Sequence, residues 1–333
     1  MDGMARPSVW TSVIFGSLLG MLWAFAVAGE PVRVGFLSPG APPRGAVSPS
    51  STLGAITQAL QELGYRPGES IVLESRYAEG HPDRLLALAT ELAALPVHVI
   101  VTFGLEAVVA SKQATSAIPI VTATGGGDFV AMGLIASWDR PGGNITGINT
   151  PTLEAVRKRV ELFTQALPSL SRLAVLVYTP NPASPQFVHE VEAVAKGRTV
   201  HVLPIPLSTA EEIEAAFDKA QQAGAQAIMV LQDPFFSQQR QKLVALATQY
   251  KWPLAGGESG FAESGAVLQV GPDNPGCGAG AAVFIDRLLK GAKASDLPIE
   301  RCRKMAVVFN LKAAHALGLT IDPTLTQGAR VIE

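Results

Sequence analysis

Short apolar strands alternate with amphipathic helices along most of the chain, and this alternation limits the fold more than any other feature. Residues 32–37 predict a buried strand, and the apolar spacing in residues 53–63 predicts the helix that follows it. Apolar strands that alternate with helices are typical of a parallel sheet covered on both faces. Further strands are expected at residues 71–77, 97–102 and 118–122, with helices beginning at Pro82 and Leu105.

The alternation pauses at a glycine-rich joint, residues 140–147, and then starts again. Residues 173–178 predict a strand of the second run, and residues 238–250 predict a helix. Ser208 and Glu211 have the spacing of a capping box that opens another helix. Two runs of βαβ units predict an α/β protein with two doubly wound parallel-sheet lobes.

The C-terminal part supplies further pieces after both lobes have been built. It predicts a helix over residues 279–289, a strand over residues 306–309, and a short helix capped by Asn310 and stopped by Gly318. Such pieces require the chain to cross between the lobes more than once. Several crossing segments would form a hinge.

The N-terminal residues predict export. Residues 13–28 carry no charge and end in Ala26-Val27-Ala28, a small-x-small cleavage site. This run is shorter than the ~20 apolar residues that a membrane-spanning helix needs. We therefore expect a signal peptide, residues 1–28, cleaved near Ala28, and a periplasmic location; an uncleaved membrane anchor is the alternative. No cysteine lies near the cleavage site, so a lipoprotein is not expected.

The two cysteines, Cys277 and Cys302, leave their pairing open. An oxidising compartment permits a disulfide between them, and two free thiols are equally compatible with the sequence. The five histidines are scattered singly, and none has metal-ligand spacing to a cysteine or another histidine. We expect no metal and no cofactor. The net charge of −2, without a basic run, argues against nucleic-acid binding.

Sequence motifs for catalysis are incomplete. The segment Gly257-Glu258-Ser259-Gly260-Phe261 lacks the second glycine of a nucleophile elbow. A phosphate-binding loop is absent, and the glycines after the first strand do not have dinucleotide-binding spacing. We do not expect an enzyme. A secreted α/β hydrolase with Ser259 as its nucleophile stays as an alternative hypothesis.

Loops at the carboxyl ends of the strands are the expected ligand site, because parallel α/β sheets bind ligands there. Hydroxyl groups and glycine N–H groups suit a carboxylate, whereas Asp233 or Glu258 would accept from an ammonium group. Structural interpretations compete: Asp233 would also cap the next helix, and Tyr178 would also suit the core. Together the loops suit an amino-acid-like zwitterion, and the candidate ligand-binding residues are Ser38, Phe103, Gly104, Thr124, Gly127, Asp128, Tyr178, Asn181, Asp233 and Glu258.

Several segments, in order along the chain, resemble the ABC transporter substrate-binding proteins of the tryptophan/aromatic amino-acid-type group, which have the type I periplasmic binding protein fold. The most specific is Arg140-Pro-Gly-Gly-Asn-Ile-Thr-Gly147. The chain departs from the usual family pattern at Asp128-Phe129-Val130 and at Gln269-Val270-Gly271. The other segments that carry the resemblance are 63–65 with Gly68, 118–121, 128–133, 289–292 with 296–298, and 310–314 with 317–319.

The resemblance implies three crossings, near Gly147, Leu268 and Ile299. Lobe 1 would then comprise residues 29–147 plus 268–298, and lobe 2 residues 148–267 plus 299–333. The implied role is the periplasmic solute-binding component of an ABC importer, a monomer that binds an amino acid or similar metabolite by hinge closure. Its partners would be that ligand and an inner-membrane permease with its ATPase. A sensor subunit that presents its ligand to a receptor is the alternative.

Overall fold

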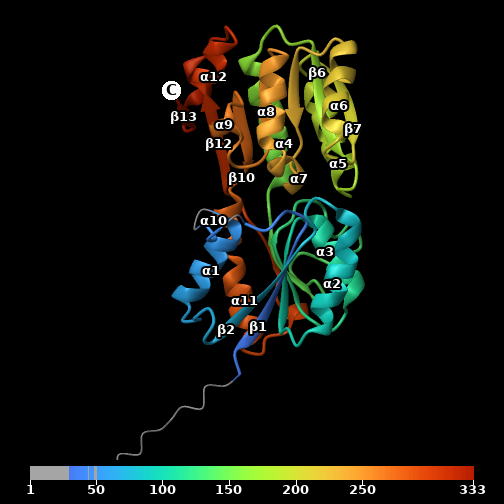
Figure 1. The fold of residues 1–333 in the computed structure, drawn as a ribbon, viewed down its shortest axis with the longest axis vertical. Helices are drawn as coiled ribbons and strands as arrows, with labels where there is room; N and C mark the ends of the chain where they lie inside the picture. Colours follow the sequence, from blue (N-terminus) through green and yellow to red (C-terminus); the bar gives the residue numbers. More distant parts are fainter. Residues whose placement is uncertain (1–29, 44, 49–50) are drawn as a thin grey trace, which may run out of the picture.

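Two lobes stacked end to end form the molecule (Figure 1). The computed structural model describes residues 30–43, 45–48 and 51–333. The expected signal peptide, residues 1–28, lies outside the described residues. Within the described ranges, no helix is both long and apolar enough to cross a membrane. Each lobe has a sheet of its own, as the alternating pattern predicts.

The first lobe contains a six-stranded sheet in the order β11-β5-β4-β3-β1-β2. All of its neighbouring strands are parallel. The glycine-rich joint, expected to interrupt the pattern, leads directly into β5 and so supplies a strand of this sheet. The strands are β1 (Val32–Ser38), β2 (Ile71–Tyr77), β3 (Val99–Phe103), β4 (Ile120–Thr124), β5 (Ile145–Asn149) and β11 (Ile299–Arg301).

Helices cover both faces of this sheet (Figure 1), which explains why the inner strands β1, β3 and β4 are mostly apolar, whereas the edge strands β2 and β11 carry charged residues. One face packs on α1 and α11 through residues such as Ile56 and Ile285. The other packs on α2 and α3 through residues such as Leu88 and Ala107. The bounds are α1 (Thr52–Glu62), α2 (Leu85–Ala94), α3 (Leu105–Ala114) and α11 (Ala281–Leu289), with short turns η1 (Pro82–Arg84) before α2 and η2 (Ala294–Asp296) after α11.

The second lobe contains a seven-stranded sheet in the order β13-β12-β10-β9-β8-β6-β7. Its neighbouring strands are parallel, as predicted, except that β10 pairs with β12 in the antiparallel sense. Pro204 and Pro206 lie in β7 at the sheet edge, where a missing N–H is tolerated. The strands are β6 (Arg172–Tyr178), β7 (His201–Leu207), β8 (Ala227–Val230), β9 (Leu254–Gly256), β10 (Leu268–Pro272), β12 (Met305–Asn310) and β13 (Arg330–Ile332).

The helices of the second lobe refine the sequence prediction at two places. The helix expected over residues 238–250 begins at Arg240, after the short separate helix α7. The capping pair of Ser208 uses Glu212 instead of Glu211, because the Glu212 carboxylate accepts from the Ser208 N–H at 2.6 Å. The helices are α4 (Thr152–Ala166), α5 (Ser184–Lys196), α6 (Glu212–Gln222), α7 (Pro234–Gln238), α8 (Arg240–Gln249), α9 (Phe261–Ser264) and α12 (Leu311–Ala316), with the turn η3 (Pro323–Thr326) near the C-terminus.

Three crossings connect the two sheets. The chain leaves the first sheet after β5, returns after β10 through α10 (Asn274–Gly278), and leaves again after β11. The resemblance places the second and third crossings near Leu268 and Ile299. In the structure Leu268 begins β10 of the second sheet and Ile299 begins β11 of the first, so each crossing follows the end of its strand. The exact residue limits of the two lobes stay a prediction.

The crossings are tied to one another where they pass between the lobes. The N–H of Cys302 donates to the carbonyl of Asn149 at 2.9 Å, and the N–H of Asp273 donates to the carbonyl of Lys304 at 3.0 Å. A disulfide joins Cys277 to Cys302, with 5.7 Å between their Cα atoms. The structure therefore decides the question that the sequence left open and places the bridge across the second and third crossings.

We expect the double substitution Cys277→Ser/Cys302→Ser to lower the free energy of unfolding by about 3 kcal/mol, because the bridge closes a loop of about 25 residues. Denaturant titration of the oxidised protein and of the variant measures the difference. The reductant-treated native protein is the control and should resemble the variant. An unchanged unfolding midpoint in both would contradict a bridge in the native protein.

Candidate functional site

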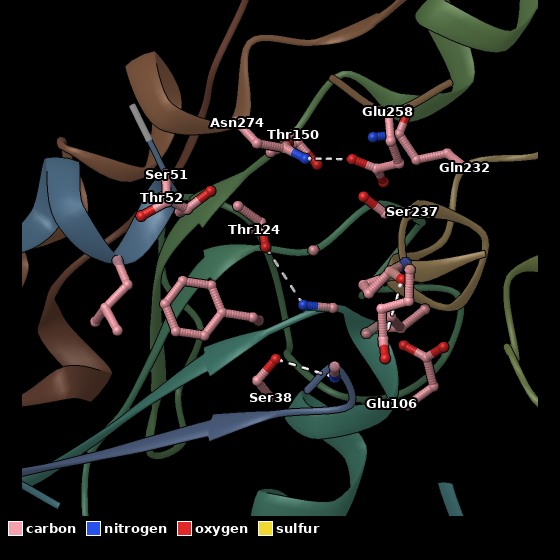
Figure 2. A pocket seen from close by; sticks show the side chains of 18 of the residues that line it. Ser38, Ser51, Thr52, Glu106, Thr124, Thr150, Gln232, Ser237, Glu258 and Asn274 are labelled. Carbon is pink, nitrogen blue, oxygen red and sulfur yellow. Dashed lines mark hydrogen bonds between the residues drawn. The ribbon is translucent and has the colours of Figure 1, made fainter. Parts of the chain in front are cut away.

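A cavity of about 350 Å³ lies between the two lobes, at the carboxyl ends of β1, β3 and β4 (Figure 2). Both lobes contribute to its wall, the first through residues such as Phe103 and the second through residues such as Asn181. Its volume falls in the range typical of small-molecule sites. The topology thus produces a cleft where parallel sheets usually bind ligands.

The first-lobe wall combines an aromatic surface with hydroxyl groups. Phe103 at the end of β3 stacks on Phe36 of β1, with 5.9 Å between the ring centroids. Ser38 ends β1, and its Oγ accepts from the Gly40 N–H at 3.1 Å. Gly104 has φ of +81° and forms the N-cap of α3, a conformation that strongly favours glycine. This wall offers an apolar body and polar edges to a ligand.

A second group of hydroxyls lines the cavity near the hinge. Ser51 caps α1, and Thr52 follows it in the first turn. Thr150, on the first crossing, lies 3.2 Å from Thr152 between their Oγ1 atoms. A Cβ at Gly126 would collide with the Thr152 side chain, so glycine is needed for this close approach. Figure 2 shows Ser51 and Thr52 side by side and Thr150 close to Asn274.

Asp233 and Asn181 hold the second-lobe loops in place. Asn181 Nδ2 donates to Asp233 Oδ2 at 2.7 Å, and the Phe235 N–H donates to Asp233 Oδ1 at 2.7 Å, which caps α7. Burial raises the pKa of Asp233 well above its usual value, and the nearby Glu106 carboxyl raises it further. The carboxyl of Asp233 is therefore committed mainly to local structure.

Glu258, in the loop after β9, is an acid with a raised pKa inside the cavity wall. Its residue is 9% exposed, and Asn274 Nδ2 donates to its Oε2 at 3.0 Å. Burial raises the pKa of Glu258 to about 7; Asp233 adds to this effect, and Arg159 opposes it. A carboxyl with such a pKa changes charge near neutral pH.

Arg159 of α4 lies fully buried behind Glu258. Its Nε donates to the carbonyl of Val270 at 2.8 Å, and its Nη1 donates to the carbonyl of Val230 at 2.7 Å. Burial lowers the pKa of Arg159 to about 10, and Glu258 opposes this shift. The guanidinium joins α4 to β8 and β10, and it does not line the cavity.

Glu106, in the first turn of α3, is the acid that the first lobe contributes. The residue is 7% exposed, and neither carboxyl oxygen has a hydrogen-bond partner among the described residues. Burial raises the pKa of Glu106, and the neighbouring Asp233 carboxyl works against this rise. Figure 2 shows Glu106 and Glu258 on opposite sides of the cavity.

The structure brings six of the ten sequence-predicted site residues to the cavity wall: Ser38, Phe103, Gly104, Thr124, Asn181 and Glu258. Four others do not line it. Asp128 caps its own loop by accepting from the N–H groups of Val130 and Ala131, and Tyr178 is buried in the second lobe, where it stacks on Phe235 at 4.3 Å. The remaining two are Gly127, which packs against Leu105, and Asp233, which caps α7.

Sequence reasoning missed several cavity residues. Glu106 could have been found from the sequence, because it is an acid in the first turn of a helix that begins directly after a predicted strand. Asn274 had none, since its segment lies on a crossing whose path depends on the packing of the whole chain. The other missed lining residues include Ser51, Thr52, Thr150, Thr152, Phe187 and Ser237.

Comparison with known families gives a match over most of the chain. The model for the family described as ABC transporter substrate binding protein matches residues 48–332. A tyrosine-binding protein of Clostridioides difficile (strain R20291) is 24% identical over 262 residues, which cover 79% of this chain and 75% of that protein.

Solved structures share the fold. A domain from Streptococcus pneumoniae in complex with L-Trp superposes with a TM-score of 0.82 at 22% identity, covering 91% of this chain and 100% of that chain. A conserved domain protein from Vibrio cholerae gives a TM-score of 0.83 at 21% identity, with the same coverage. These likenesses show the two-lobed fold of type I periplasmic binding proteins.

The raised pKa of Glu258 predicts a pH-dependent stability. The folded protein keeps this proton up to about pH 7, whereas an unperturbed glutamate loses it near 4.5. The free energy of unfolding should therefore fall as pH rises from about 4.5 to 7, by about 3 kcal/mol for this group. We expect Glu258→Gln to reduce this fall in denaturant titrations across the interval. Glu192→Gln, an exposed site on α5, is the control, and an equal pH dependence in all three proteins would refute the assignment.

Proposed function

The chain belongs to the ABC transporter substrate-binding protein family, and on that basis we propose that its cleft captures an amino acid or a similar amino-bearing metabolite for an importer. The observation that carries the proposal is the cavity whose wall comes from both lobes. A ligand that contacts both lobes stabilises their closed arrangement relative to an open one. The permease would then recognise the closed form.

The chemistry of the cavity supports an amino-bearing ligand. The apolar body of the ligand would pack on Phe103 and Phe36, and its ammonium group would donate to Glu258. Hydroxyls such as those of Thr150 and Thr124 would accept or donate at its polar end. The family relatives named for tyrosine and bound to L-Trp are consistent with this assignment.

The arrangement favours capture over catalysis. Ser259, the nucleophile of the hydrolase hypothesis, is exposed and is not among the described residues that line the cavity. No histidine occurs among those lining residues, so the serine–histidine pair of that hypothesis is not assembled in the cavity wall. We propose that the protein works as a monomer without a cofactor, exported to the periplasm, and that it delivers its solute to an inner-membrane permease with its ATPase.

Export can be tested on the protein recovered from a periplasmic fraction. We expect intact-mass spectrometry to give a chain that starts at Gly29, because Ala26-Val27-Ala28 has the form of a cleavage site. An Ala28→Arg variant is the matched control and should accumulate uncleaved. A native chain that keeps its first 28 residues in the membrane fraction would instead support the anchor hypothesis.

Ligand capture can be tested by a thermal-shift screen of the exported protein against amino acids, amines and other small metabolites. A ligand present at 100 times its dissociation constant should stabilise the native state by about 2.7 kcal/mol, a shift of several degrees. Phe103→Ala should weaken binding of that ligand at least tenfold in calorimetry, because the stacking surface is lost. Val283→Ala, an exposed apolar site on α11, is the control and should bind normally. Absence of any ligand across the panel would overturn the proposal.

A further inference from the structure

Glu106 is a buried acid whose carboxyl interacts with another acid, Asp233 of the opposite lobe. Its residue is 7% exposed, it lines the cavity, and neither oxygen accepts a hydrogen bond from the described residues. A buried carboxylate is costly unless it is paired, because the protein cannot replace its hydration. The other two acids nearby are supported: Asp233 accepts from Asn181 and from Phe235 N–H, and Glu258 accepts from Asn274. Of the three acids, Glu106 is the one to which no other described residue donates an N–H hydrogen bond.

Acidic groups outnumber basic groups around the cavity. The described lining residues include two acids, Glu106 and Glu258, and no lysine, arginine or histidine. Asp233 lies behind Glu106, and the guanidinium of Arg159 lies behind Glu258, where two backbone carbonyls also hold it. Three acidic groups therefore accompany one basic group. A zwitterion of zero net charge would leave this imbalance unchanged, whereas a ligand of net positive charge would reduce it.

We propose that Glu106 selects solutes of net positive charge, its carboxylate accepting from a cationic nitrogen of the ligand. The inference rests on the proposed function and narrows its ligand class to amino compounds with more cationic nitrogens than carboxylates, such as amines and basic amino acids. Glu258 of the second lobe faces the same cavity, so cationic groups held by the two acids would link the lobes. The aromatic wall at Phe103 and Phe36 accommodates the carbon skeleton.

A purely structural role for Glu106 makes a different prediction. In that role Glu106 would stay protonated against Asp233 and hold α3 to α7 across the cleft, whatever the ligand. Its replacement would then weaken every ligand equally or lower the melting temperature of the empty protein. Selection of a cation instead requires an effect that depends on the charge of the ligand.

The test compares ligands matched in shape and differing in charge. The probes are lysine with norleucine and Nε-acetyllysine, and tyramine with tyrosine and N-acetyltyramine, titrated by calorimetry into the exported native protein. We expect a net cation to bind at least tenfold more tightly than its neutral or zwitterionic matches. Glu106→Gln should reduce this preference below threefold while the melting temperature of the empty protein stays the same or rises.

The control variant is Glu211→Gln, which removes the same charge from an exposed site on the second lobe, outside the cavity. It should keep the preference for cations. Equal binding of cations and their neutral matches by the native protein would overturn the inference and leave solute capture standing. An equal loss for all probes in Glu106→Gln would also overturn it. Failure of these probes and of the wider metabolite panel to bind at all would overturn both the inference and the proposed function.

Discussion

The mutual attachment of the three crossings determines how the rest of the molecule can work. Backbone hydrogen bonds join the third crossing to the first at Cys302 and Asn149, and to the second at Lys304 and Asp273. The bridge from Cys277 to Cys302 adds a covalent link at the same level. Because three tied segments bend together, the lobes are expected to open and close about this level instead of separating independently. A cleft on one side of such a hinge has a reproducible shape in its closed state.

The hinge also reaches the ligand site directly. The side chain of Asn149, at the end of β5, donates to the carbonyls of Gly125 and Gly127 at 3.0 and 3.2 Å. Thr150, the next residue, lines the cavity. The loop that follows β4 is therefore held by the first crossing, so a change in hinge angle would be felt in the cavity wall. Movement of the hinge would therefore shift cavity-lining residues directly, through the first crossing itself.

The fold was largely predictable because its signals are local, whereas the site depends on contacts between distant parts of the chain. Apolar runs such as residues 32–37 and 173–178 became strands within one residue of the prediction, and Asn310 caps α12 as expected. The strand β7 escaped prediction because its two prolines argue against a strand unless its edge position is known. For Tyr178 and Asp233 the sequence left a ligand contact and a structural role open, and the reason is related. The sequence places both residues at strand ends. Contacts with Phe235 and Asn181, which the sequence does not show, turn their side chains into the second lobe instead of the cavity.

The acidic groups explain why closure and ligand capture should depend on each other. Burial raises the pKa of Glu106 and of Asp233, and these carboxyls come from opposite lobes. Closing the empty cleft therefore desolvates both acids, which costs free energy and favours their protonated forms. A cationic group placed between the lobes would offset the same cost without a proton. On the proposed selection of cations, this cost would disfavour closure of the empty cleft, and a cationic ligand would offset it.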